Sequence, residues 1–192
     1  MIRSALALCI WLAVTVPANA ATSATAATSA KAVATVQTVS GQLTVQRKGV
    51  TARVPLEKAG SVYAGDEATT GSKSYATFLV YDGSEWRLNE NSSTFINPPT
   101  RDAKGHQSLF RSVYGEVMAK LRPGKSIQTP GGIIGVRGTV LHLRVEADGL
   151  TTVTVLEGEV DFYNEQGGVI IDRKSTRLNS SHIQKSRMPS SA

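Results

Sequence analysis

The spacing of apolar residues between positions 35 and 171 is the feature that most constrains the fold of this 192-residue chain. Apolar side chains recur there with a period close to two, as in Thr77–Tyr81, rather than the 3.6 of a helix. Turn sequences such as Asp82-Gly83-Ser84 and Ala147-Asp148-Gly149 separate the short apolar runs. The nearest approach to a helical pattern, Arg111–Leu121, suits a strand equally well. We therefore expect an all-β domain.

Glycines that recur between the predicted strands indicate which β architectures this domain can adopt. A small or acidic residue beside a glycine precedes one strand-like segment after another, at Ser40-Gly41, Ala59-Gly60, Ala64-Gly65-Asp66, Thr70-Gly71 and Asp82-Gly83. These glycine-containing segments are suited to tight turns between short strands, because glycine tolerates backbone angles at which a side chain would clash. We expect a short-stranded β-solenoid or β-roll, with a β-sandwich as the alternative.

The N-terminal twenty residues have the composition of a secretory signal peptide. A basic start is followed by the apolar run Ala5–Val16 and by the small residues of Ala18-Asn19-Ala20. Twelve helical residues span about 18 Å, which is short of the ~30 Å hydrocarbon core of a bilayer. We expect cleavage after Ala20, no stable membrane anchor thereafter, and a periplasmic or secreted protein. Residues 21–34, rich in Ala, Thr and Ser, read as a low-complexity linker.

The composition changes abruptly at the other end of the chain. Residues 172–192 are polar, rich in serine and without β-periodicity, which is typical of a disordered tail. The stretch Asp172–His182 also resembles the conceptual translation of a short-read sequencing adapter. We therefore expect residues 172–192 to be an artefact and the folded domain to occupy residues 35–171.

Charge distribution excludes nucleic acid as the expected partner. The chain has a formal net charge of +6, from 21 Lys and Arg against 15 Asp and Glu. Arg3 contributes one positive charge and residues 172–192 contribute a net four, so residues 21–171 carry only +1. A nearly neutral domain lacks the basic surface on which nucleic-acid binding depends.

No group of residues in the sequence predicts catalysis, a metal site or a cofactor. Cys9 is the single cysteine and lies in the predicted signal peptide, and His106 and His142 stand in unrelated contexts. Gly131–Gly135 lacks the Lys-Ser/Thr ending of a phosphate-binding loop and reads as a tight β-corner. Three acids, Glu157, Glu159 and Asp161, alternate as if along one solvated strand face. We expect a protein that is not an enzyme and needs no cofactor.

Several segments between residues 36 and 164 carry short motifs in a fixed order. They are Val39–Gly41, Leu56–Asp66, Thr69–Ala76, Phe78–Ser84, Ile127–Pro130, Ile134–Thr139 and Val153–Val160. Together they resemble the FecR-type periplasmic domain family, and Ile127–Pro130 with Ile134–Thr139 are the most specific part. The resemblance singles out Gly65, Asp66, Asp82, Gly83, Ser84, Thr129, Pro130, Gly135, Val136, Arg137, Gly138, Thr139, Glu157 and Gly158.

We expect these motif residues to do mainly structural work. Gly65 and Gly83 supply turns that need positive φ, and Pro130 removes a donor at a strand end. Arg137 is the one charge among small and apolar neighbours. We expect its guanidinium to cap loop carbonyls or to pair with a carboxylate, and contact with a partner is the alternative role.

The resemblance also implies a function. Members of the family with the full architecture couple an outer-membrane receptor to a cytoplasmic sigma factor through an anti-sigma segment and a membrane span. In this chain only the predicted signal peptide and linker precede the domain. The resemblance therefore implies a stand-alone exported module for protein interaction or signalling in a Gram-negative envelope, with an envelope protein as partner. A cell-wall or polysaccharide-binding module is the alternative.

Overall fold

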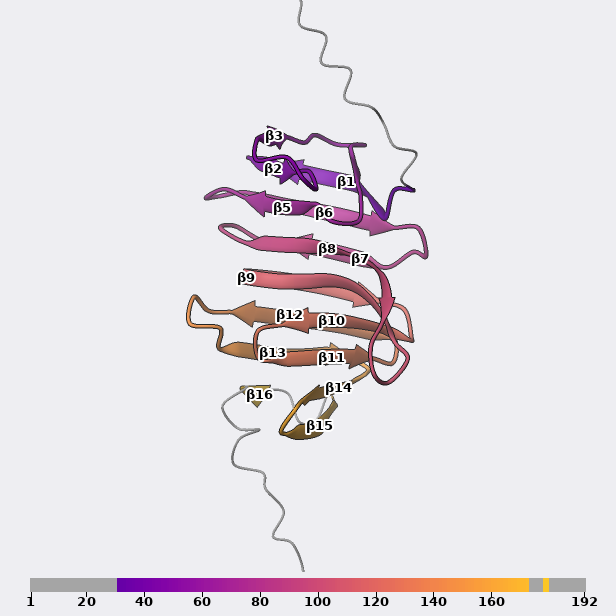
Figure 1. Ribbon diagram of the computed structural model, residues 1–192. Coiled ribbons are helices and arrows are strands. Elements are labelled where there is room, and N and C mark those ends of the chain that lie inside the picture. The colour runs from indigo at the N-terminus through magenta and orange to yellow at the C-terminus, as the bar shows by residue number, and fades with distance from the viewer. Residues whose placement is uncertain (1–30, 173–177, 180–192) are drawn as a thin grey trace, which may run out of the picture.

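The computed structural model describes residues 31–172 and 178–179, and every regular element within them is a strand. This confirms the predicted all-β class (Figure 1). The strands are β1 (Ala34–Ser40), β2 (Leu43–Gln46), β3 (Arg53–Pro55), β4 (Ser61–Val62), β5 (Glu67–Thr70), β6 (Tyr75–Val80), β7 (Glu85–Leu88), β8 (Ser93–Arg101), β9 (Gln107–Leu121), β10 (Lys125–Thr129), β11 (Gly132–Val136), β12 (Thr139–Val145), β13 (Thr151–Glu157), β14 (Glu159–Asn164), β15 (Gly167–Asp172) and β16 (Leu178–Asn179).

Three regions named from the sequence fall wholly or mostly outside the described residues. They are the predicted signal peptide at 1–20, most of the linker at 21–34 and most of the tail at 172–192. At the linker's end, Ala34 opens β1. Within the tail, Asp172 ends β15, and Leu178–Asn179 pair with β13. Among the described residues, no helix has the length and apolar character that crossing a membrane requires.

Backbone hydrogen bonds join the sixteen strands into one connected sheet that forms two layers. One layer has the order β4-β1-β6-β7-β9-β12-β13-β16, and the other has the order β3-β2-β5-β8-β9-β10-β11-β14-β15. Neighbours are antiparallel except β9 and β10, which are parallel. Figure 1 shows strands of the two layers one behind the other at successive levels.

Strand β9 belongs to both layers and changes layer at Gly115. Its residues up to Tyr114 pair with β8, and those from Gly115 onward pair with β12. Gly115 has φ +94°, and a Cβ there would lie within van der Waals overlap of the Ser92 side chain. Glycine is therefore required where the strand bends past its neighbour. The segment Arg111–Leu121, nearest to a helix by pattern, is strand throughout.

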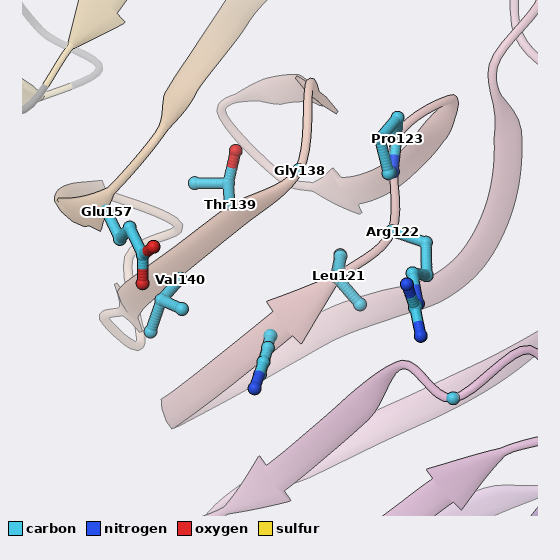
Figure 2. Close-up of a pocket in the computed structure, with 9 residues that line it drawn as sticks. Leu121, Arg122, Pro123, Gly138, Thr139, Val140 and Glu157 are labelled. Carbon is cyan, nitrogen blue, oxygen red and sulfur yellow. The ribbon is translucent and has the colours of Figure 1, made fainter.

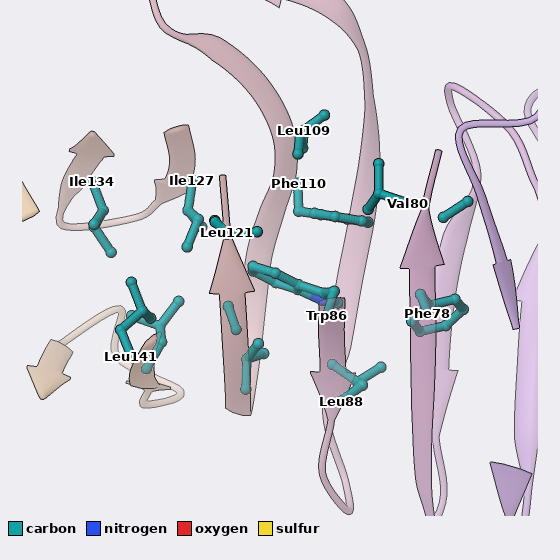
Figure 3. Packing of buried hydrophobic residues seen from close by; sticks show 14 of the residues in the cluster. Phe78, Val80, Trp86, Leu88, Leu109, Phe110, Leu121, Ile127, Ile134 and Leu141 are labelled. Atoms are coloured by element: carbon teal, nitrogen blue, oxygen red, sulfur yellow. The ribbon is translucent and has the colours of Figure 1, made fainter. Parts of the chain in front are cut away.

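The core fills the space between the layers. Trp86 on β7 stacks on Phe110 on β9, with ring centroids 4.5 Å apart and an interplanar angle of 16° (Figure 3). Phe110 lies in the half of β9 that pairs with β8, so this contact joins the two layers. Both rings are fully buried. Each removes roughly 150–250 Å² of largely apolar surface from water, and the stacked pair adds about 0.5–1.5 kcal/mol.

Two turns predicted from sequence occur as predicted. Asp82-Gly83-Ser84 joins β6 to β7, and Gly83 has φ +82°. Ala147-Asp148-Gly149 lies in the hairpin between β12 and β13, where Gly149 N donates to the Glu146 carbonyl at 3.0 Å. Both positive-φ positions are glycines, because other residues pay a steric penalty there.

The closed end of the β8–β9 hairpin extends past the edge of the neighbouring strand β5. Its register is irregular between Ile96 and Thr100, where Pro98 and Pro99 have no amide to donate to the ladder. We call residues 97–107 the strap. Figure 1 shows it crossing the side of the molecule at the levels of β10 and β11 toward β14.

Candidate functional site

Three connections that carry motif residues meet at one corner of the molecule. The Asp82–Ser84 turn, the β11–β12 connection and the β13–β14 connection surround a pocket of about 340 Å³ (Figure 2). We call this the motif corner. The pocket is lined by Gly83, Lys120, Leu121, Arg122, Pro123, Gly138, Thr139, Val140 and Glu157, of which four were singled out from sequence.

Two glycines allow the last two connections to pack backbone against backbone. Gly138 has φ +80° and Gly158 has φ +84°. A Cβ on Gly158 would lie 2.4 Å from the Gly138 carbonyl oxygen, a distance that no folded backbone tolerates. The buried Thr139 completes the contact, because its hydroxyl donates to the Glu159 carbonyl at 2.7 Å. These contacts fix the shape of the corner.

The Asp82–Ser84 turn is held by an ion pair and a cap. Ser84 N donates to the Asp82 carboxylate at 2.9 Å, and Lys125 Nζ lies 2.9 Å from its other oxygen. Burial alone raises the pKa of Asp82, but the hydrogen bonds from Lys125 and Ser84 outweigh it, and the pKa lies below its ordinary value. The buried Ser84 hydroxyl accepts from Arg122 N at 3.1 Å, which ties the turn to the end of β9.

Arg137 pairs with a carboxylate, which is one of the two structural contacts expected from the sequence. Its Nη1 lies 3.1 Å from Glu159 Oε1, and its amide donates to the Glu159 carbonyl at 3.2 Å. The Arg137 side chain is 63% exposed and that of Glu159 is 37% exposed. Exposed pairs of this kind stabilise a fold by little, because water screens them. The glycine and threonine contacts hold the corner, and the guanidinium remains accessible.

The rim of the pocket carries charged side chains, and two of them lack an ion-pair partner among the described residues. Neither Lys120 nor Arg122 ion-pairs with an acid among the residues that the structure describes. Glu157 lines the pocket on the side opposite Arg122 (Figure 2). A register shift between Val140 and Leu141 places an extra β13 residue here, and Leu156 is 43% exposed. Bulges of this kind commonly re-aim side chains at functional edges.

The expectation that Glu157, Glu159 and Asp161 share one strand face is wrong. Glu157 ends β13, whereas Glu159 and Asp161 belong to β14 in the other layer. The positive-φ Gly158 turns the chain between them. A two-residue alternation in sequence cannot reveal that the strand has ended.

The other motif residues lie away from this corner or beneath it. The buried Asp66 accepts from Arg47 Nη1 and from Tyr63 N at 2.9 Å, while Gly65 at φ +96° packs under Lys48. Thr129 closes the turn at Pro130, since its hydroxyl donates to the Gly132 carbonyl at 2.9 Å. Val136 lies on β11 and is buried in the hydrophobic core. The predicted site residues therefore lie at one corner, at two separate turns and, for Gly135 and Val136, within β11.

Sequence reasoning missed a polar cluster beneath the strap. The Asp102 side chain is 1% exposed and accepts from Tyr163 Oη at 2.7 Å and from His106 N at 2.9 Å. His106 Nδ1 lies 3.3 Å from the same carboxylate, and its ring packs on Gly135, where a Cβ would be 2.9 Å from His106 Cε1. Gly135 is thus a motif glycine whose missing side chain makes room for this imidazole. The four-residue spacing of Asp102 and His106 was the available signal.

The electrostatics of the cluster favour the charged carboxylate. Burial raises the pKa of Asp102, but the hydrogen bonds from Tyr163 and from the His106 amide, with the Ser126 hydroxyl nearby, lower it further than burial raises it. For Tyr163, burial and the neighbouring Asp102 both raise the pKa of the phenol, so it remains a donor. Lys104 on the strap also lies 4.1 Å from the Tyr163 ring centroid and pairs with Asp161. The cluster fastens the strap to β14.

Metal ligation finds no support in the described part of the chain. No group of three or more His, Cys, Asp or Glu side chains converges there. His142 Nε2 lies 3.6 Å from Glu116 Oε2 on the sheet surface, a pair rather than a site.

Comparison with known proteins identifies one family. The model of the FecR protein family matches residues 66–161, half of the chain and inside the range 36–164 in which the motifs were found. No curated protein sequence matches significantly. A crystal structure of a predicted anti-sigma factor from Parabacteroides distasonis is 16% identical, with a TM-score of 0.46. The alignment covers 59% of this chain and 58% of that one.

Proposed function

The chain belongs to the FecR protein family, and from this premise we propose that it is an exported, non-catalytic module that binds another envelope protein through the motif corner. The observation that carries the proposal is that exposed charged side chains stand on a closely packed backbone. Gly138, Gly158 and Thr139 fix the backbone, whereas Lys120 and Arg122 lack ion-pair partners among the described residues. Functional residues are commonly presented in this way, on connections positioned by a rigid sheet.

The chemistry of the corner suits a protein partner. Its rim offers cations and an acid, and the exposed Leu156 directly precedes Glu157 in the chain. Such a mixture fits an interface with an apolar centre and a polar rim. The guanidinium of Arg137 is accessible beside it. Arginine is enriched at interfaces because its planar fork binds carboxylates in two places at once. We therefore propose contact with a partner as the role of Arg137.

The test is a binding assay with two arms. Tagged protein is mixed with solubilised envelope proteins in one arm and with purified peptidoglycan in the other. Arg122→Glu should abolish capture of a discrete envelope protein, whereas Lys58→Glu, a charge reversal on the exposed loop before β4, should leave it unchanged. Capture by peptidoglycan that Arg122→Glu weakens would overturn the proposal in favour of a cell-wall module.

The same family membership supports a proposal for the location of the protein. We propose that the domain acts in the periplasm, as FecR domains typically do, after removal of the predicted signal peptide 1–20. Fractionation of cells making the full chain tests this, because retention in the cytoplasm would contradict it. N-terminal sequencing of the periplasmic form should begin at Ala21.

For the fold we propose the β-roll rather than the sandwich. The chain passes repeatedly between the layers, as from β1 to β2 and from β5 to β6, and β9 is shared by both. Sandwiches keep two separate sheets, whereas a shared strand is what continuous rolling of one sheet would produce. An experimental structure in which β9 is broken at Gly115 would favour the sandwich.

A further inference from the structure

A groove of about 630 Å³ crosses the outer face of the layer that runs from β3 to β15, away from the motif corner. Its floor is a row of side chains in register. Arg111 on β9 is the cross-strand neighbour of Gln128 on β10. Gln128 is in turn the neighbour of Ile133 on β11, and Ile133 is the neighbour of Tyr163 on β14. Ala103 of the strap and the turns β10–β11 and β14–β15 complete the lining.

The two turns form a rigid wall of this groove. They are joined by the Asn164 side chain, whose amide donates to the Gly131 carbonyl at 3.3 Å. Gly132 packs so closely on β14 that a Cβ there would lie 2.7 Å from the Tyr163 carbonyl oxygen. Asn164 Oδ1 also accepts from Gln166 N at 2.9 Å, which fixes the second turn. A groove that is formed before its ligand arrives loses little conformational entropy on binding.

The lining contains one cation, Arg111, and one acid, Glu165. Both are exposed, and neither ion-pairs with another of the described residues. The Arg111 guanidinium lies over the Phe95 ring, 4.8 Å from its centroid, a contact that restricts it without using its N–H groups. Lys104 of the strap is already paired with Asp161 and takes no part in the argument. The groove therefore presents two free charges of opposite sign.

These two charges stand at opposite ends of the groove. Arg111 and Tyr163 are three strand spacings apart, which is about 14 Å at the backbone. Glu165 lies two residues beyond Tyr163, in the β14–β15 turn. An extended chain advances about 3.3–3.6 Å per residue, so about four residues span this distance.

We propose that the groove binds a short peptide of about four residues with both ends free, its carboxylate on Arg111 and its ammonium on Glu165. Gln128 suits the backbone of such a ligand. Its Oε1 accepts from Asn97 Nδ2 at 3.3 Å, which leaves its own amide N–H groups to donate to a peptide carbonyl. The half-buried Ile133 beside it offers an apolar surface to a peptide side chain.

A sugar chain fits this lining less well. Among the residues that line the groove, Tyr163 alone is aromatic, and it is 9% exposed. Lys104 Nζ lies 4.1 Å from its ring centroid, so the ring offers no open face for stacking. The two separated charges also have no counterpart on a neutral sugar. The ligand is thus a peptide, bound at a second site that does not depend on the motif corner.

Calorimetry with tetra-alanine tests the proposal. The full chain should bind the peptide with free ends, and N-acetylation or C-amidation should each weaken binding by about fivefold or more, because each removes one charged contact. Arg111→Gln should bind the free and the amidated peptide equally and still discriminate against the acetylated one. Glu165→Gln should show the reverse pattern.

The controls separate this site from the motif corner and from a loss of folding. Arg111 and Glu165 are exposed, so neither substitution should change the melting temperature greatly. Arg122→Glu should leave peptide binding unchanged. The proposal is overturned if the parent chain binds no peptide at millimolar concentration, or if it binds free and end-blocked peptides equally. Binding of a tetramer of N-acetylglucosamine that Arg111→Gln abolishes would overturn it in favour of a sugar site.

Discussion

The hydroxyl of Tyr163 on β14 donates a 2.7 Å hydrogen bond to the carboxylate of Asp102 on the strap. The two residues are 61 positions apart in sequence, and the bond ties a hairpin of β8 and β9 to a strand two positions beyond β10. Asp102 has almost no contact with solvent, so its charge depends on this bond and on the neighbouring His106 and Ser126. Sheet pairing holds the two ends of the strap, and this buried hydrogen bond to a carboxylate holds its middle against β14.

Removing the phenol oxygen should loosen the strap. Tyr163→Phe leaves a buried carboxylate short of one donor, which costs about 1–3 kcal/mol of the free energy of unfolding. Chemical denaturation measures this. Tyr81→Phe is the matched control, because Tyr81 is 60% exposed and its hydroxyl bond to Gln107 is 3.4 Å long, so its effect should stay within about 0.5 kcal/mol. Equal effects of the two substitutions would contradict the buried contact.

Acid should destabilise the fold through the same group. The folded-state pKa of Asp102 lies below its ordinary value of 3.8, so its carboxylate stabilises the fold above that pH. This contribution is lost as pH falls through the folded-state pKa. Asp82 has the same sign, so Asp102→Asn should flatten, and not abolish, the fall in melting temperature below pH 4. Parallel curves for the parent chain and Asp102→Asn would show that the carboxylate is not held charged.

Gly158 should tolerate no side chain. Gly158→Ala combines positive φ with a Cβ placed 2.4 Å from the Gly138 carbonyl oxygen, so the backbone must move. We expect a loss of about 2–4 kcal/mol in the free energy of unfolding. Gly49→Ala has φ +76° but nothing within 4 Å of the added Cβ, and it isolates the cost of the backbone angle at about 1 kcal/mol. A smaller loss for Gly158→Ala than for Gly49→Ala would mean that the corner is not packed as described.

Arg137 should matter to binding more than to stability. Because its ion pair with Glu159 is exposed, Arg137→Ala should change the melting temperature little, while capture of the envelope partner should fall at least tenfold. Thermal unfolding and binding are measured on the same preparation. A large loss of stability with binding retained per folded molecule would assign Arg137 to the fold alone.

The sequence predicted the elements that depend on local chemistry. The two-residue period from Thr77 to Val80 and the turn at Asp82–Gly83 are encoded within a few positions, and both are found. For Arg137 the sequence left loop carbonyls and a carboxylate both open, and the structure places the carboxylate of Glu159 beside it.

What the sequence could not predict depends on contacts between distant segments. The change of layer by β9 at Gly115 follows from the position of Ser92, which no local pattern reveals. The strap cluster joins Asp102 to Tyr163 across most of the C-terminal half of the domain. Likewise, the packing of Gly158 on Gly138 ends β13 at Glu157. The alternating pattern of acids continues past this point in the sequence, although the strand does not.

Crosslinking in living cells tests the central claim, that the motif corner binds an envelope protein, most directly. A photoreactive residue is placed at Glu157, on the rim of the pocket, or at Val54 on β3, which is 42% exposed at the far N-terminal end. We predict that irradiation at position 157 yields a discrete crosslinked protein species and that Arg122→Glu removes it. The same species at both positions, or none at 157, would contradict the claim.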